Sequence, residues 1–137
     1  MSQSIHFLPV LVSAAAVFGL GALWYSPLLF GKAWLKVHGY TAETLAAMRA
    51  TAGRAYAVTF VCYLVMAAAM SILLQRVGVV SALTGIKLGA LLGIGIAAPL
   101  GLTANVYSDK PLAAWAIDAA YQIAYLMLMG AILAAWR

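Results

Sequence analysis

Residues 55–75 read A-Y-A-V-T-F-V-C-Y-L-V-M-A-A-A-M-S-I-L-L-Q and carry no formal charge between Arg54 and Arg76. A transmembrane helix needs about 20 predominantly apolar residues to cross about 30 Å of hydrocarbon, and this stretch is long enough. Its apolar residues are continuous, whereas the strands of a membrane barrel alternate apolar and polar residues. The stretch therefore predicts a transmembrane helix.

The same pattern recurs elsewhere in the chain. Charged residues are also absent from 1–31, 88–108 and 119–136. We therefore predict an all-α fold, an integral membrane four-helix bundle that forms a single transmembrane domain over residues 1–137. The expected helices cover about 5–26, 54–75, 84–107 and 112–135, and a loop covers 27–53.

The composition supports a membrane protein. Hydrophobic residues make up 66% of the chain and charged residues 8%, whereas a soluble domain has about 25% charged residues. So few charges cannot cover a water-facing surface. This excludes an ordinary soluble enzyme, a disordered protein, a coiled coil and a nucleic-acid-binding domain, and it makes the lipid bilayer the expected partner.

Basic residues are distributed unevenly between the two ends of the expected bundle. Five fall on the side of the 27–53 loop, and three on the other side: Lys32, Lys36, Arg49, Arg54 and Lys110 against Arg76, Lys87 and Arg137. Short cytoplasmic loops carry the excess of lysine and arginine. We therefore expect a cytoplasmic loop and both termini outside the cytoplasm.

The loop itself has helical features. Residues 28–37 have the pattern of a short amphipathic helix in the headgroup region, with Trp34 as its anchor. Gly39 can end this helix, and Thr41 can cap a second helix over 42–52. The alternative, that both pieces are only connectors, stays open.

Asp118 is the most unusual polar residue. It lies seven residues after Pro111, a favoured first residue of a helix, and so about 10 Å deep at about 1.5 Å per residue. An ionisable side chain at this depth is costly and usually faces protein or water. Tyr121 and Gln122 share its helical face, and Arg54 is a candidate ionic partner.

Three further polar residues fall in the same membrane half: Tyr25, Tyr56 and Asn105. Helices one and three end on that side, and helices two and four begin there. We therefore predict a cytoplasm-facing ligand-binding site formed by Asp118, Gln122, Tyr121, Asn105, Tyr25, Tyr56 and Arg54. Two structural explanations stay open, because tyrosines populate interfacial belts and polar side chains form interhelical hydrogen-bond networks.

Small residues recur at every fourth position of the third expected helix: Gly85, Gly89, Gly93, Ala97 and Gly101. Such a stripe lets helix backbones approach closely. The contact can lie within the chain or between two copies, so a homo-oligomer stays open. Pro99 interrupts the backbone hydrogen bonding of this helix and predicts a kink.

The two halves of the chain share a similar segment. Residues 15–26 and 97–108 are identical at seven of twelve positions without a gap. A duplication would make the bundle a parallel 2+2 repeat, an arrangement that some small transporters use. Chance similarity between two alanine-rich helices is the alternative.

Signals for catalysis are weak. The single cysteine, Cys62, has no basic neighbour in sequence, and His6 and His38 are expected on opposite sides of the membrane. The chain has no HExxH, GxSxG or glycine-rich phosphate motif. We expect no catalytic residue, no metal and no cofactor.

Residues Gly21–Trp34, G-A-L-W-Y-S-P-L-L-F-G-K-A-W, resemble the hallmark of a bacterial membrane family catalogued as domain of unknown function 1761. Three later segments resemble the family too: T-A-N at 103–105, W-A-I-D-A-A-Y at 115–121 and M-G-A-I-L at 129–133. The resemblance covers almost the whole chain. It implies a four-helix protein of the bacterial inner (plasma) membrane and implies no activity.

Two functional hypotheses follow. In the first, the protein binds or transports a small polar solute or ion through the polar site around Asp118. In the second, it is a small structural or regulatory membrane subunit without a ligand, and the polar groups only hold the helices together. A membrane enzyme ranks third.

Overall fold

The computed structural model describes residues 6–136, which are helical throughout apart from short turns. Four helical segments are long and apolar enough to cross a membrane: α1 (Phe7–Trp24), α4 (Ala52–Val77), the continuous α5 to α6 segment (Ala82–Tyr107) and α7 (Leu112–Ala135). This confirms the predicted all-α class and the four membrane helices. The expected start of the first helix at residue 5 lies outside the described residues.

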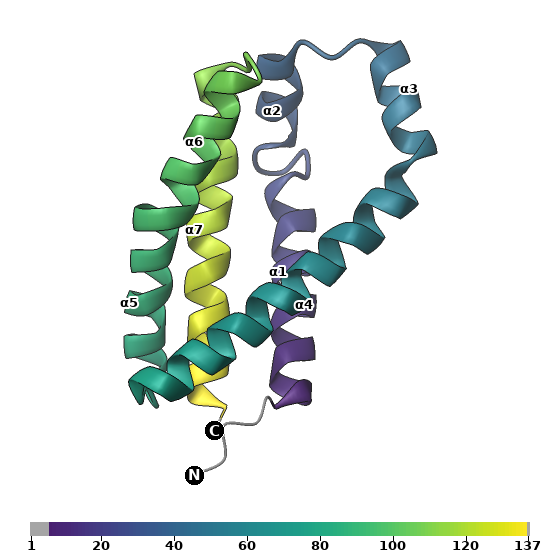
Figure 1. Cartoon of the computed structure of the whole chain (residues 1–137). Helices are drawn as coiled ribbons and strands as arrows, with labels where there is room; N and C mark the ends of the chain where they lie inside the picture. Colours follow the sequence, from purple (N-terminus) through teal and green to yellow (C-terminus); the bar gives the residue numbers. More distant parts are fainter. Residues whose placement is uncertain (1–5, 137) are drawn as a thin grey trace.

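The helices are arranged as three neighbours and one crossing helix (Figure 1). α1, α5 to α6, and α7 run side by side, and α4 crosses them diagonally. The buried residues of α4 lie between Tyr63 and Leu74, whereas residues 53–58 are exposed. The first turns of α4 therefore diverge from the bundle, and α3 (Ala42–Ala50) lies beyond them.

The core forms where α1, α4 and α7 meet. Val17, Leu74 and Met129 are completely buried there, together with Ala14 and Ala67. Because lipid tails are as apolar as these side chains, van der Waals packing rather than the hydrophobic effect drives helices together in a membrane.

α5 (Ala82–Leu92) and α7 are in backbone contact through glycines. A Cβ atom added to Gly85 would overlap the carbonyl group of Gly130, and one added to Gly89 would overlap that of Leu126. The glycine stripe thus packs against a helix of the same chain, which confirms the predicted close contact.

A π-helical turn, η1 (Gly93–Ala97), separates α5 from α6 (Ala98–Tyr107). Pro99 follows this turn and has no N–H to donate to the carbonyl group of Gly95. One wide turn accommodates this break in the hydrogen-bond ladder. The structure therefore has a π-helical turn just before Pro99, where we predicted a kink.

Two short helices fill the 27–53 segment. α2 (Gly31–His38) ends at Gly39, which has a left-handed φ of 66°, and the side chain of Thr41 caps α3 by accepting from the Thr44 N–H at 3.2 Å. Helices were predicted over 28–37 and 42–52, and the structure has helices over 31–38 and 42–50. The headgroup location of α2 and the 2+2 repeat stay predictions.

Candidate functional site

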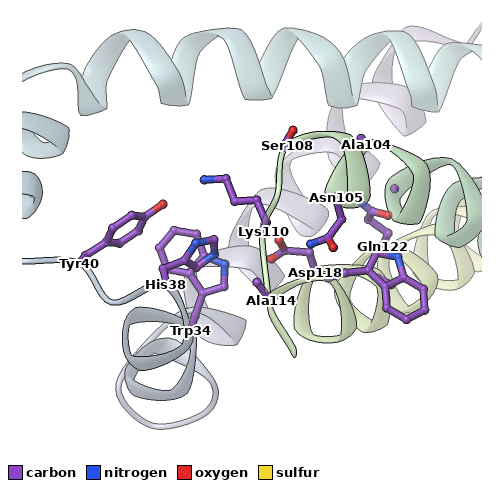
Figure 2. Close-up of a pocket in the computed structure, with 13 residues that line it drawn as sticks. Trp34, His38, Tyr40, Ala104, Asn105, Ser108, Lys110, Ala114, Asp118 and Gln122 are labelled. Carbon is purple, nitrogen blue, oxygen red and sulfur yellow. The ribbon is translucent and has the colours of Figure 1, made fainter. Parts of the chain in front are cut away.

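A pocket of about 390 Å³ lies where α2 approaches the α6–α7 end of the bundle (Figure 2). One wall comes from α2 and the residues after it, and the other from α6, α7 and the turn between them. Thirteen residues line it: Trp34, His38, Tyr40, Gly101, Ala104, Asn105, Ser108, Lys110, Ala114, Trp115, Asp118, Ala119 and Gln122.

Asp118 lies in the second turn of α7 and is half-buried at the pocket wall. Its Oδ1 accepts a short hydrogen bond from the Tyr25 hydroxyl group, at 2.5 Å. Tyr25 directly follows α1, so this bond joins the end of α1 to the beginning of α7. Within residues 6–136 it is the single hydrogen bond that the Asp118 carboxylate group accepts, and its Oδ2 accepts none.

The α2 wall is an aromatic cluster of Trp34, His38 and Tyr40. The ring centroids of Trp34 and His38 are 4.2 Å apart, and the His38 ring stacks on Tyr40 at 4.8 Å with an interplanar angle of 12°. Trp34 Nε1 and His38 Nε2 are buried and have no hydrogen-bond partner among the described residues. Buried polar atoms are almost always paired in folded proteins, so these two atoms are exceptions within the α2 wall.

The turn after α6 positions Lys110. Asp109 has a left-handed φ of 54°, and the Lys110 N–H donates to the Asn105 carbonyl group at 3.1 Å. This is the bonding pattern that ends many helices. The Asn105 side-chain Nδ2 donates to the carbonyl oxygen of Pro111 at 3.1 Å, so Asn105 both lines the pocket and fixes the turn.

Trp115 and Gln122 form the deeper part of the α6–α7 wall. The Trp115 indole N–H donates to the carbonyl oxygen of Ala98 at 2.9 Å, which fixes the orientation of the ring. A Cβ atom at Gly101 would lie 3.6 Å from the indole and 3.7 Å from Gln122 Oε1. Both distances are ordinary van der Waals contacts, so Gly101 of α6 packs directly beside the two side chains.

His38 is the titratable group of the α2 wall. Burial lowers the pKa of His38 below its ordinary value, and the positive charge of Lys110 lowers it further, while Asp118 acts weakly in the opposite direction. Both charged groups of the pocket are thus close enough to act on the imidazole. The lowered pKa of His38 favours the neutral imidazole at neutral pH.

Tyrosines pack beneath the pocket and connect three helices. The Tyr121 hydroxyl group donates to the Val17 carbonyl oxygen at 2.8 Å, so Tyr63 donates in turn to the Tyr121 oxygen at 3.0 Å. Tyr125 donates to the sulfur atom of Met66 at 3.6 Å. These hydrogen bonds join α1, α4 and α7 inside the core.

The structure separates the seven residues that the sequence grouped into one site. Asp118, Gln122 and Asn105 line the pocket. Tyr25 binds Asp118 from outside the lining, and Tyr121 is buried in the core. Arg54 and Tyr56 are exposed on α4, away from the pocket lining.

Five residues that we did not predict for the site also line the pocket: Trp34, His38, Tyr40, Lys110 and Trp115. The spacing of tryptophan, histidine and tyrosine at 34, 38 and 40 was the available signal, because residues four apart share a helix face. In residues 6–136 no group of three or more His, Cys, Asp or Glu side chains is placed to hold a metal ion.

Comparison with known proteins identifies a family. The family model described as "Protein of unknown function (DUF1761)" matches residues 8–134, nearly the whole chain. No curated protein and no solved structure matches the chain at a significant level.

Proposed function

The chain belongs to the DUF1761 family of proteins of unknown function, and from its pocket we propose that this multi-pass membrane protein binds a small polar solute or ion. A ligand site is typically a concave space of about 300–1,000 Å³ with a few converging polar groups. The pocket volume of about 390 Å³ is at the small end of this range. The site therefore suits a solute of a few heavy atoms.

The unpaired polar atoms of the α2 wall carry the proposal. Trp34 Nε1 and His38 Nε2 are buried without a protein partner, and leaving such a group unsatisfied costs about 1–3 kcal/mol. Both atoms belong to side chains that line the pocket opposite Asp118. A bound solute would satisfy them and recover this free energy.

The proposed orientation puts the pocket on the cytoplasmic side of a bacterial plasma membrane. The pocket lies at the end of the bundle where α1 ends and α7 begins, next to the 31–50 helices. The lysine and arginine bias favours a cytoplasmic location for this end. The solute would thus be taken from, or released to, the cytoplasm.

A structural or regulatory subunit is the second candidate, and the tyrosine cluster favours it. Tyr25, Tyr63 and Tyr121 all use their hydroxyl groups to join helices. A protein whose polar groups serve only this purpose needs no ligand. The difference between the candidates is whether the α2 wall and Asp118 bind solute.

Thermal stability in detergent, measured with and without solutes, tests the proposal. A panel of inorganic ions, amino acids, polyols and quaternary ammonium compounds is added to wild type, Trp34→Phe and Asp118→Asn. We expect at least one solute to raise the wild-type melting temperature and to raise that of the variants less. Trp24→Phe, which removes an indole outside the pocket, is the matched control and should respond as the wild type does.

No stabilisation of the wild type by any solute would contradict the proposal and favour the structural subunit. Equal stabilisation of all four proteins would show that the solute binds elsewhere.

A further inference from the structure

The pocket contains one side chain of each formal charge. Lys110 enters it from the α6–α7 turn and Asp118 from α7. Among the described residues these two groups form no ion pair with each other, although both lie close enough to act on His38. Their charges sum to zero, so the pocket favours a solute that is neutral overall or that carries both charges.

The hydrogen-bond donors gather on the Lys110 side. Figure 2 shows the Lys110 side chain extending from the turn toward His38 and Tyr40. The unpaired Trp34 Nε1 can only donate, and a neutral His38 can donate through Nε2. An ammonium group with two neighbouring N–H donors is a site for a carboxylate group.

The hydrogen-bond acceptors and an aromatic ring gather on the other side. Asp118 has one carboxylate oxygen beyond its bond to Tyr25, and Gln122 contributes an amide next to it along the pocket wall. The Trp115 ring is held by its bond to Ala98. A carboxylate group beside an aromatic face attracts an ammonium group, methylated or not.

We propose that the ligand of the pocket is a small zwitterion, with its ammonium group toward Asp118 and Trp115 and its carboxylate group toward Lys110, Trp34 Nε1 and His38 Nε2. This inference rests on the proposed solute-binding function and narrows it to one class of solute. A zwitterion satisfies both charges of the pocket and the two buried N–H groups at once.

Three solutes of the same shape separate the charge requirements. Glycine betaine carries both charges, choline replaces the carboxylate group by a hydroxymethyl group, and 3,3-dimethylbutanoate replaces the ammonium nitrogen by carbon. The dissociation constant of each is measured by titration calorimetry on the full-length protein in detergent. Glycine is added as a zwitterion without methyl groups.

We expect one of the two zwitterions to bind at least about tenfold more tightly than both choline and 3,3-dimethylbutanoate. Lys110→Met should reduce zwitterion binding about tenfold and leave choline binding unchanged. Asp118→Asn should weaken zwitterion and choline binding but not that of 3,3-dimethylbutanoate. Lys87→Met, on the exposed side of α5, is the matched control and should bind as the wild type does.

Choline or 3,3-dimethylbutanoate binding as tightly as the best zwitterion would overturn the inference and leave the solute-binding function in place. If other polar solutes stabilise the protein but neither zwitterion does, the zwitterion inference is also overturned and the solute-binding function stays in place. If no solute of any class binds, the solute-binding function itself is wrong. These comparisons on the wild type do not depend on whether the variants fold.

Discussion

Asp118 contributes to both the fold and the pocket. Its carboxylate group holds the end of α1 and also faces the pocket. The hydroxyl group of Tyr25 donates to it at 2.5 Å, while the Tyr25 ring packs edge-on against Trp34 and Tyr121. The orientation of the carboxylate group in the pocket is therefore set by α1. A carboxylate at this depth in a helix needs such a partner.

Tyr25→Phe tests the structural part of this role. The ring contacts remain, and one hydrogen bond to Asp118 is lost, so we expect the free energy of unfolding to fall by about 1 kcal/mol, within the range for such bonds in membranes. Chemical unfolding in mixed micelles measures it. Tyr56→Phe removes a hydroxyl group from an exposed tyrosine and should change stability by less than about 0.5 kcal/mol. An equal fall in the free energy of unfolding of Tyr25→Phe and Tyr56→Phe would contradict the structural role of the Tyr25 hydroxyl group.

His38 gives the α2 wall a pH dependence. Burial and Lys110 keep the pKa of His38 below its ordinary value in the folded protein, with Asp118 opposing them weakly. The unfolded chain binds a proton near pH 6.5, so the folded state loses stability as the pH falls from neutral through this value. We expect the melting temperature of the wild type to fall more between pH 7 and pH 5 than that of His38→Gln. If the melting temperatures of the wild type and His38→Gln fall equally between pH 7 and pH 5, His38 does not cause the pH dependence.

The tight α5–α7 contact holds one wall of the pocket in place. The contact depends on glycines, because the two backbones are too close for a Cβ atom at Gly85 or Gly89. α7 in turn carries Asp118, Trp115 and Gln122 to the pocket. Separation of these two helices would move the whole α7 wall.

Gly89→Ala should therefore destabilise the fold by about 1–3 kcal/mol, the usual cost of overpacking. Gly19→Ala is the matched control, because a Cβ atom at Gly19 of α1 meets nothing within 4 Å. Alanine there should leave stability unchanged or raise it by up to about 1 kcal/mol, since it favours helix. Melting temperatures of the two variants check this, and an unchanged value for Gly89→Ala would mean that α5 and α7 are further apart than described.

Most elements of the fold were predictable from the sequence. Charged residues mark where apolar helices end, and Gly39 and Thr41 mark the boundaries of the short helices. The π-helical turn before Pro99 was not predictable, because a proline is compatible with a kink or a wide turn. Helical periodicity shows which residues share a face, and it does not show which other helix that face meets.

The site was predictable only in part for the same reason. Asp118, Gln122 and Asn105 are polar residues in apolar helices, so the sequence reveals them. Trp34, His38 and Tyr40 reach the pocket because α2 folds over the end of α7, which is a tertiary contact. Arg54 and Tyr56 lie elsewhere because α4 crosses the bundle diagonally and carries its first turns away.

The pocket and the two short helices share one end of the bundle. Five of the eight lysine and arginine residues are expected at this end as well, so we expect both termini outside the cytoplasm. Alkaline phosphatase fused after Arg137 should be active, and a fluorescent protein that matures only in the cytoplasm should be dark at the same site. An inactive alkaline phosphatase and a bright fluorescent protein would instead place the pocket outside the cytoplasm.

A pocket that binds a polar solute must be reached by water, and cysteine accessibility in membranes measures whether it is. Cys62, which is exposed, is first replaced by alanine. Gln122→Cys then places a thiol in the pocket wall about 15 Å into α7, at about 1.5 Å per residue. Ala120→Cys places one on the exposed surface of the same helix, outside the pocket.

A small water-soluble methanethiosulfonate reagent, applied to open membrane vesicles, should modify Gln122→Cys at least about tenfold faster than Ala120→Cys, since lipid around the second thiol excludes water and charged reagents. If both thiols react equally slowly, no water-filled pocket reaches Gln122 and the solute-binding function is contradicted.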